Sequence, residues 1–285
     1  MPNKEIPPSV QAKRLLHQSG LRAKKTLGQH FLIDETVLQT IVEAAELSPD
    51  DTVIEVGPGL GILTVELAKR AGSVVAVELD TKLASLLKRK LGSASNVRII
   101  NADILKVSLS QLLEGHSNYK VVANLPYYIT SPVLRYFVEA LPKPSLMVMM
   151  MQKEVGEAIV AVPGKMSLLA VSLQVYSKPG IICHVPSQCF YPQPKVDSVI
   201  LRFDLLPEPA VRVADMNGFF DVVRAGFSLP RKQLHNSLAH SLRMKPIEIA
   251  LLLEKARIDS KRRAETLSLE EWASLYEALA ASGRG

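Results

Sequence analysis

The chain has 285 residues, of which 47% are hydrophobic and 22% are charged. These values exclude a disordered, collagen-like or coiled-coil chain, and the formal net charge of +6 is a modest excess. Because the length exceeds one average domain, we expect a folded protein with one large domain and a smaller one.

The cysteine count and the apolar stretches narrow the class of protein further. Only two cysteines occur, Cys183 and Cys189, which is too few for a disulfide scaffold or a paired zinc site. Residues 146–151 form the longest apolar stretch, far below the roughly 20 residues that a membrane helix needs. We therefore expect a cytoplasmic protein with no membrane segment and no metal, in which both cysteines and Trp272 serve packing.

The positive charge is concentrated at the two ends of the chain. Residues 1–30 carry six Lys and Arg against one Glu, and residues 207–285 carry twelve Lys and Arg against ten acidic residues. Basic ends would bind a polyanion such as nucleic acid, although a solvated basic arm is the more common reason for a charge run. Composition alone leaves both interpretations open.

In chain order, the hydrophobic pattern first alternates between helices and strands. Residues 35–47 have helical spacing, with Asp34 as a candidate N-cap. Helical patterns such as 62–71 and 81–91 separate short apolar runs, which predicts an α/β domain with a parallel, doubly wound sheet. The predicted strands are 52–56, 74–78, 97–101, 120–124 and 146–152.

The last third of the chain changes character. Residues 181–185 and 196–204 have strand patterns joined by a proline-rich loop, which favours an antiparallel closing pair. Pro207 and Pro209 then indicate a linker. Helical patterns follow at 216–227, 232–243, 246–255 and 269–281, the last with Ser268 at its start. We predict a basic N-terminal arm (1–33), an α/β domain (34–206) and a helical domain (207–285).

A glycine-rich turn follows the first predicted strand. Gly57, Gly59 and Gly61 have GxGxG spacing, and such a turn lets the backbone approach a ligand where a side chain would clash. The spacing differs from the GxGxxG of pyrophosphate binders, and Glu55 precedes it, which favours a cofactor without phosphates over NAD.

Two acidic residues continue this pattern at the next strands. Glu78 ends the second predicted strand, where a carboxylate can accept the hydroxyls of a ribose, and Asp103 follows the third, where it can receive an adenine amine. Each feature also has a structural explanation, because glycines permit tight turns and carboxylates cap helices. Their joint occurrence at the carboxyl ends of successive strands favours a ligand crevice.

A candidate catalytic motif stands at the end of the fourth predicted strand, at Asn124, Leu125, Pro126 and Tyr127. An adenine amine is a poor nucleophile because its lone pair is delocalised into the ring. The side-chain oxygen of Asn124 and the backbone carbonyl of Leu125 could each accept an N–H bond and favour a tetrahedral amine. Pro126 would fix the turn and Tyr127 would offer a stacking face for an extruded base. Outside this context, an ordinary strand-ending turn is the simpler explanation.

Taken in order, these motifs resemble the ribosomal RNA adenine N6,N6-dimethyltransferases. The similarity covers the chain from about residue 20 to its C-terminus. The residues that carry it are Leu27-Gly28-Gln29-His30-Phe31-Leu32, Glu55-Val56-Gly57-Pro58-Gly59-Leu60-Gly61, Glu78, Asp103, Asn124-Leu125-Pro126-Tyr127 and Phe190-Tyr191-Pro192-Gln193-Pro194-Lys195-Val196-Asp197-Ser198.

The resemblance implies a Rossmann-like methyltransferase sheet that uses S-adenosylmethionine, followed by a small C-terminal helical domain. It implies transfer of two methyl groups to each of two adjacent adenines near the 3′ end of small-subunit (16S) ribosomal RNA. The partner would be a 30S assembly intermediate, and we expect a monomer that acts in ribosome biogenesis.

The resemblance also implies roles for single residues. His30 and Leu32 would border the cofactor, Gly57 would lie against its methionine part, and Gly59 would join them in the cofactor site. Glu78 would bind the ribose, Asp103 the adenine, and Asn124 would face the reacting amine. For His30, packing in the core is the structural alternative.

Further residues are candidates for RNA contact. Phe190 would form a second aromatic wall opposite Tyr127, although core packing is the more common role of a single phenylalanine, and Lys195 could reach a phosphate. Basic residues of the C-terminal helices could bind an RNA helix by its shape and backbone, or they could simply be solvated. They are Arg224, Arg231, Lys232, Arg243, Lys261, Arg262 and Arg263.

Three alternatives to this function remain. The first is a macrolide-resistance methylase acting on large-subunit RNA. The PxPKVDS segment and the helical tail resemble the small-subunit enzymes better. The second is a non-catalytic binding protein of the same fold, such as a relative of a mitochondrial transcription factor, and Glu78, Asp103 and Asn124 argue against it. The third is a dehydrogenase, which the GxGxG spacing disfavours.

Overall fold

The computed structural model describes residues 10, 23–24 and 27–283. The contacts divide the chain into two compact units, one of Met1–Gly156 with Pro179–Leu205 and one of Glu157–Lys178 with Leu206–Gly285. The second unit resumes next to the linker expected at 207, but it also contains Glu157–Lys178, which the sequence pattern had placed with the sheet. Most of the expected arm at 1–33 lies outside the described residues.

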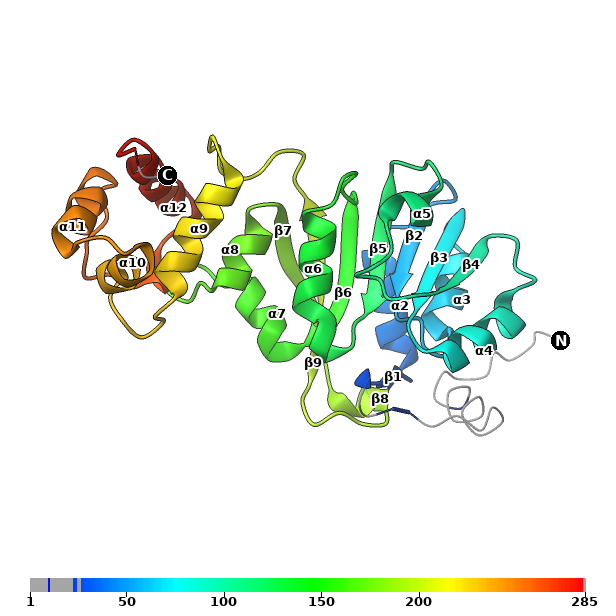
Figure 1. Cartoon of the computed structure of the whole chain (residues 1–285). Coiled ribbons are helices and arrows are strands. Elements are labelled where there is room, and N and C mark those ends of the chain that lie inside the picture. The colour runs from blue at the N-terminus through cyan, green and yellow to red at the C-terminus, as the bar shows by residue number, and fades with distance from the viewer. Residues whose placement is uncertain (1–9, 11–22, 25–26, 284–285) are drawn as a thin grey trace. The chain divides into compact units, whose positions relative to one another are not determined.

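A sheet forms the centre of the first unit (Figure 1). In its described part seven strands run in the order β4-β3-β2-β5-β6-β9-β7. The five from β4 to β6 are parallel, and β9 runs antiparallel to β6, so the expected doubly wound sheet is confirmed. The strands are β2 (Thr52–Val56), β3 (Ser73–Glu78), β4 (Val97–Asn101), β5 (Tyr119–Asn124), β6 (Leu146–Gln152), β7 (Ser177–Val185) and β9 (Ser198–Leu205).

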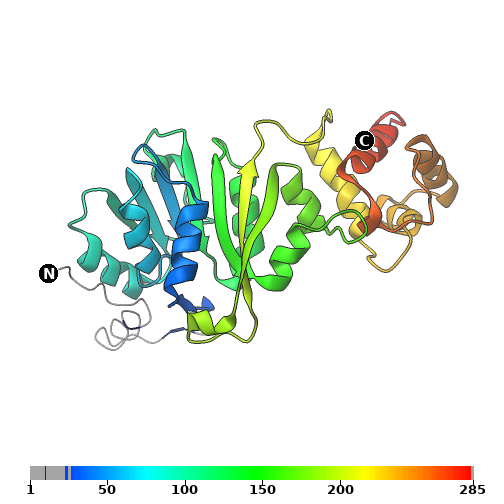
Figure 2. The same ribbon diagram turned by 180° about the vertical axis from the view of Figure 1, so that it is seen from behind.

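Helices cover both faces of this sheet. Helix α2 lies on the face seen in Figure 2, and α6 lies on the face seen in Figure 1. Apolar residues of α2 and α3 pack with β-strand valines in one buried cluster, which explains the helical spacing of the sequence. The helices of this part of the chain are α2 (Glu35–Ala44), α3 (Ile62–Ala68), α4 (Thr81–Leu91), α5 (Leu109–Leu113), α6 (Thr130–Val138) and α7 (Lys153–Ile159).

The register of the parallel strands brings their carboxyl ends to one edge. Val56 of β2 is paired with Val77 of β3 on one side and with Ala123 of β5 on the other. Glu78 and Asn124 each follow these partners by one residue, so both emerge at the same edge of the sheet. This edge is where open α/β sheets usually bind ligands.

A second, two-stranded sheet was not predicted. Strand β1 (Phe31–Leu32) pairs antiparallel with β8 (Phe190–Tyr191), and Leu32 is the register partner of Phe190. The short 3₁₀ helix η3 (Ser187–Cys189) leads into β8. This pairing fixes the segment before α2 to the proline-rich loop, although Leu32 and Phe190 are 158 positions apart in the sequence.

The second unit is built from helices around its own apolar core. Phe219, Leu253 and the fully buried Trp272 are among its members. Ala170 and Val171 of α8 are buried in the same cluster, which is why Glu157–Lys178 groups with the later helices. The helices are α8 (Leu168–Gln174), α9 (Met216–Phe227), α10 (Leu234–Leu242), α11 (Pro246–Lys255), η4 (Ala264–Thr266) and α12 (Leu269–Ala280).

Local capping agrees with the sequence where polar residues precede helices. Asp34 accepts a hydrogen bond from the Val37 amide, and Ser268 forms a reciprocal capping box with Glu271. In the described part of the chain, no helix combines the length and the apolar character that crossing a membrane requires.

Candidate active site

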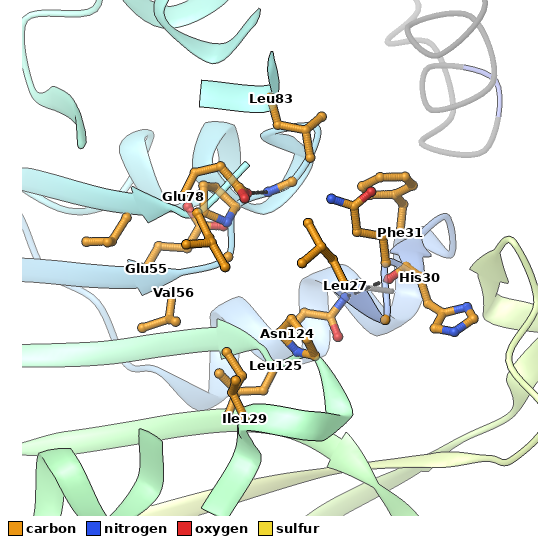
Figure 3. A pocket seen from close by; sticks show the side chains of 18 of the residues that line it. Leu27, His30, Phe31, Glu55, Val56, Glu78, Leu83, Asn124, Leu125 and Ile129 are labelled. Carbon is orange, nitrogen blue, oxygen red and sulfur yellow. Dashed lines mark hydrogen bonds between the residues drawn. The ribbon is translucent and has the colours of Figure 1, made fainter. Parts of the chain in front are cut away.

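A pocket opens at the carboxyl edge of the sheet, within the first unit (Figure 3). Every residue that the sequence singled out for catalysis or cofactor binding lines it. The eleven are His30, Leu32, Gly57, Gly59, Glu78, Asp103, Asn124, Leu125, Pro126, Tyr127 and Phe190. Residues far apart in the sequence therefore form one continuous wall.

The glycine turn forms the floor of this pocket between β2 and α3. Gly57 has φ +68°, a left-handed conformation that favours glycine, and a Cβ built there would be in ordinary contact with Pro126 at 3.7 Å. At Gly61 the space is already filled, because a Cβ would come within 2.5 Å of Leu87. The first glycine thus lines the pocket without a side chain, and Gly61 serves packing against α4.

Glu78 lies beside this turn and is held by backbone groups. Its two carboxylate oxygens accept hydrogen bonds from the amides of Gly59 (3.0 Å) and Asp80 (2.8 Å). The residue is only 6% exposed, and burial raises its pKa above the ordinary value despite these bonds. A carboxylate fixed in this way has lone pairs left for the hydroxyls of a ligand.

A second carboxyl group, Glu55 on β2, lies deeper in the same wall. It is 1% exposed, and burial raises its pKa to about 8. Among the described residues its Oε2 atom has no hydrogen-bond partner. From the sequence, Glu55 only distinguished the glycine motif from that of phosphate binders. The burial of its carboxyl could not be recognised from the motif alone.

Asp103 lies in the loop after β4 and remains partly exposed. One carboxylate oxygen accepts a hydrogen bond from the Leu105 amide at 3.1 Å, and Lys106 lies 3.9 Å from the other. The side chain is 34% exposed, so it is accessible to a ligand as well as stabilising its own turn. The position of Asp103 is therefore compatible with binding a cofactor amine and with capping its own turn.

Asn124 ends β5 and is oriented by the segment before β1 (Figure 3). Its Nδ2 donates a hydrogen bond to the backbone carbonyl of His30 at 3.3 Å. This bond orients the side-chain amide of a residue that lines the pocket, and its oxygen is the acceptor that the side chain offers to a ligand.

The aromatic residues of the site are arranged around Tyr127, in the 3₁₀ helix η2 (Tyr127–Ile129). The His30 ring stacks on Tyr127 with centroids 5.8 Å apart and an interplanar angle of 24°. His30 Nδ1 lies 2.7 Å from the Pro192 carbonyl, which can only accept, so this nitrogen carries the hydrogen. The Tyr127 hydroxyl lies 3.2 Å from that of Ser198, while Phe190 is 3% exposed and packs in the core cluster.

Sequence reasoning missed a polar cluster at the rim of the pocket. Asp80, two residues after Glu78, forms an ion pair with Lys24 at 2.7 Å and accepts a hydrogen bond from the Gln29 side chain at 3.4 Å. Gln29 belongs to the motif at residues 27–32, but only the folded chain brings it to the N-terminus of α4. A carboxylate two residues beyond a strand end also fits an ordinary N-cap, so its sequence position gave no signal of this cluster.

The basic residues of the second unit differ in how they are used. Arg262 pairs with both carboxylate oxygens of Glu271 and donates to Thr266, so it holds η4 to α12. Arg224 pairs with Asp221, and Arg263 lies 3.9 Å from Glu265. The Arg262 guanidinium is thus engaged in internal bonds, which sequence alone could not distinguish from a free surface charge. In the described ranges no cluster of His, Cys, Asp or Glu has the makings of a metal site.

Comparison with known families decides between the interpretations of this site. The profile of the family described as ribosomal RNA adenine dimethylase matches residues 20–281. The chain belongs to this family. The expected enzyme class, an rRNA adenine dimethyltransferase, is thereby confirmed, and S-adenosylmethionine is the expected methyl donor.

Curated relatives carry a consistent name. A protein of Dehalococcoides mccartyi named ribosomal RNA small subunit methyltransferase A is 51% identical over 266 residues, which cover 93% of this chain and 91% of the relative. Proteins of the same name from Moorella thermoacetica and Bacillus mycoides are 42% and 44% identical. Their alignments cover 93% and 97% of this chain and 95% and 98% of the relatives.

Two solved structures agree with the fold. The 23S rRNA methyltransferase ErmE is 30% identical, with a TM-score of 0.70 over 88% of this chain and 99% of its own. A dimethyladenosine transferase from Plasmodium falciparum is 24% identical, with a TM-score of 0.76 over 89% and 98%. The latter likeness concerns the fold alone, and together they confirm the expected Rossmann-like sheet with C-terminal helices.

Proposed function

We propose that this family member dimethylates the N6 amino groups of two adjacent adenines near the 3′ end of small-subunit ribosomal RNA. The observation that carries the chemistry is the orientation of Asn124, whose amide nitrogen is tied to the His30 carbonyl at 3.3 Å. The names of the 51%, 42% and 44% identical relatives support the small subunit as substrate.

The pocket has the features that S-adenosylmethionine requires. Gly57 lines the pocket without a side chain, so a ligand can approach its backbone, and the fixed carboxylate of Glu78 suits the two hydroxyls of a ribose. Asp103, accessible at the next strand end, suits an exocyclic amine. The unpartnered Oε2 of buried Glu55 is a further polar group that a charged ligand could satisfy.

When bound, this cofactor supplies a methyl group on a positively charged sulfur. The proposed work of the protein is to place that group and the amine in line, since positioning converts a two-molecule encounter into a single-step transfer. In this proposal His30 and Leu32 border the cofactor, Gly57 lies against its methionine part with Gly59 beside it in the site, Glu78 holds the ribose and Asp103 the adenine.

Asn124 and the backbone after it would activate the target amine. The Asn124 side-chain oxygen and the Leu125 carbonyl would accept its two N–H bonds, while Pro126 fixes the turn that carries them. Two acceptors on one side of the nitrogen favour a tetrahedral geometry, which returns the lone pair from the ring to the nitrogen. After transfer the nitrogen is an acidic ammonium that releases its proton to water, so no strong general base is needed.

The extruded base would be captured by aromatic walls. Tyr127 already has its ring fixed by the His30 stack and by the contact of its hydroxyl with Ser198, so it is preorganised as a stacking platform. Phe190 would form the opposing wall, and Lys195 would contact phosphate. In the second unit Arg231, Lys232, Arg243 and Lys261 are the proposed contacts to an RNA helix.

The proposal includes the setting of the reaction. The substrate would be a 30S assembly intermediate, since a base near the RNA terminus must be extruded before it can enter the pocket. The protein would act in the cytoplasm and as a monomer, since the pocket already holds all eleven predicted site residues and needs none from a second copy.

Purified protein incubated with labelled S-adenosylmethionine and separate unmethylated small and large ribosomal subunits tests this proposal. Label is expected in small subunits only, and Asn124→Ala is the matched inactive control. Label confined to large subunits would favour a resistance methylase. Cofactor binding without transfer to either subunit would favour a non-catalytic binding protein.

A further inference from the structure

The rim of the pocket holds a charged cluster that the proposed chemistry does not use. Asp80 is 5% exposed and lies at the N-terminus of α4. Its Oδ1 accepts a hydrogen bond from the Lys82 amide at 3.0 Å, which caps the helix. Its Oδ2 faces a different part of the chain, the Lys24 ammonium at 2.7 Å and the Gln29 amide group at 3.4 Å.

Lys24 and Gln29 are themselves connected. The Lys24 amide donates to the Gln29 side-chain oxygen at 2.8 Å, and the Gln29 amide donates to the Lys24 carbonyl at 3.3 Å. Asp80 therefore contacts two residues that are also hydrogen-bonded to each other. Burial of Asp80 alone would raise its pKa, but the bonds from Lys24, Lys82 and Gln29 hold that pKa below the ordinary value.

Gln29 belongs to residues 27–33, which we call the β1 segment. Its first six residues, 27–32, all line the pocket. Phe31 packs with Leu60 and Leu83, and a Cβ on Gly59 would lie 3.1 Å from its ring. The segment thus forms the wall of the pocket that faces the glycine turn.

Asp80 also contacts the opposite wall, through its backbone. Its amide donates to Glu78 Oε1 at 2.8 Å. One residue therefore binds the proposed ribose carboxylate through its main chain and the β1 segment through its side chain. A ligand between Glu78 and the β1 segment would be in contact with both walls that Asp80 joins.

We propose that Asp80 is a positioning residue that holds the β1 segment over the pocket through its ion pair with Lys24, and thereby slows cofactor exchange. This inference rests on the proposed function in that the pocket binds S-adenosylmethionine. The ion pair has one buried partner, since the Asp80 side chain is 4% exposed and that of Lys24 is 46% exposed. Such a pair is less screened by solvent than one between two exposed groups.

Two substitutions remove the ion pair. Asp80→Asn also replaces the Oδ2 acceptor of the Gln29 bond by an amide nitrogen, whereas Lys24→Met leaves that bond in place. Asp80→Asn preserves the N-cap, because asparagine caps helices as well as aspartate does, and leaves the amide bond to Glu78 intact. Lys24→Met removes the ammonium and retains the apolar stem. Glu139→Gln, which breaks the exposed Arg135–Glu139 pair on α6, is the matched control.

Hydrogen exchange of the ligand-free proteins tests the segment directly. We expect Asp80→Asn and Lys24→Met to raise the exchange rates of peptides covering 27–33 by about threefold to tenfold, as loss of an ion pair of this kind permits. The double variant should exchange no faster than Asp80→Asn, because both substitutions remove the same ion pair. Exchange in the helices of the second unit and in Glu139→Gln should equal that of wild type.

Stopped-flow dissociation of S-adenosylmethionine tests the consequence. Both variants should release the cofactor about threefold to tenfold faster than wild type, and rising potassium chloride should accelerate wild type more than Asp80→Asn. The proposal would be overturned if both variants kept the hydrogen-exchange rates and the cofactor dissociation rate of wild type. An effect of Asp80→Asn that Lys24→Met does not share would also overturn it. If wild type does not bind S-adenosylmethionine, the proposed function fails, whereas the exchange experiment still decides the role of Asp80.

Discussion

Glu55 offers a quantitative test of the buried wall of the pocket. The carboxyl is 1% exposed and its pKa is raised from 4.5 to about 8 by burial, with a further contribution from the charge of Glu78. Between these two values the folded protein holds a proton that the unfolded chain has released. Stability must therefore fall as the pH rises through this range, and the loss is complete above the folded pKa.

The size of this effect follows from the linkage relation. One extra proton on the folded state lowers the free energy of unfolding by about 1.4 kcal/mol for each pH unit. Glu55→Gln does not titrate and resembles the protonated carboxyl in shape. From pH 5 to pH 7 the variant should thus gain about 3 kcal/mol relative to wild type.

Guanidinium unfolding at pH 5, 6 and 7 measures this difference. Circular dichroism gives the transition, and amide exchange in β2 assigns it to the sheet that carries Glu55. The comparison at pH 5, where little of the difference has developed, is the internal control. A free-energy difference between Glu55→Gln and wild type that stays constant from pH 5 to pH 7 would refute the argument from burial.

Substitutions at four further residues separate binding, catalysis and folding. Asn124→Ala should lower kcat by more than about a hundredfold and leave the Kd of S-adenosylmethionine within about threefold, measured by calorimetry and label transfer; equal losses in both would assign Asn124 to the cofactor. Glu78→Gln should weaken cofactor binding about tenfold or more, because charge-assisted bonds to the ribose are lost; an unchanged Kd would place the ribose elsewhere. Tyr127→Ala should reduce kcat/KM for the RNA by about tenfold to a hundredfold, since base stacking contributes about 1–3 kcal/mol, whereas Tyr127→Phe should retain most of it; equal losses would exclude stacking. Arg262→Ala should lower the free energy of unfolding of the second unit by about 1–2 kcal/mol through loss of the Glu271 pair, and fluorescence of Trp272 should report it; unaltered stability would make Arg262 an ordinary surface charge.

Much of the first unit could be predicted because its signals are local. Strands β2, β4 and β6 and helix α4 have the predicted bounds. A continuous apolar run reflects a strand buried on both faces, and helical spacing reflects a helix buried on one face. The pocket edge followed from the same pattern, because parallel strands must end together. Helix ends were less exact: α2 ends at Ala44 and α3 at Ala68, where the apolar spacing alone predicted a few residues more.

Long-range features could not be read from the chain. The pairing of Phe31–Leu32 with Phe190–Tyr191 joins two-residue strands, which are too short for any periodicity. Helix α8 carries a plain apolar run, and nothing in that run says which core it joins. The Asp80–Lys24 pair and the Arg262–Glu271 pair depend in the same way on which charges the fold brings together.

Mapping of modified nucleosides tests the central claim most directly. Small-subunit RNA from the methylation reaction is digested and analysed by mass spectrometry, with unmethylated RNA and the Asn124→Ala reaction beside it. The account predicts N6,N6-dimethyladenosine at two adjacent positions near the 3′ end, and none with Asn124→Ala. Methylation at any other base, or dimethyladenosine formed equally well by Asn124→Ala, would contradict it.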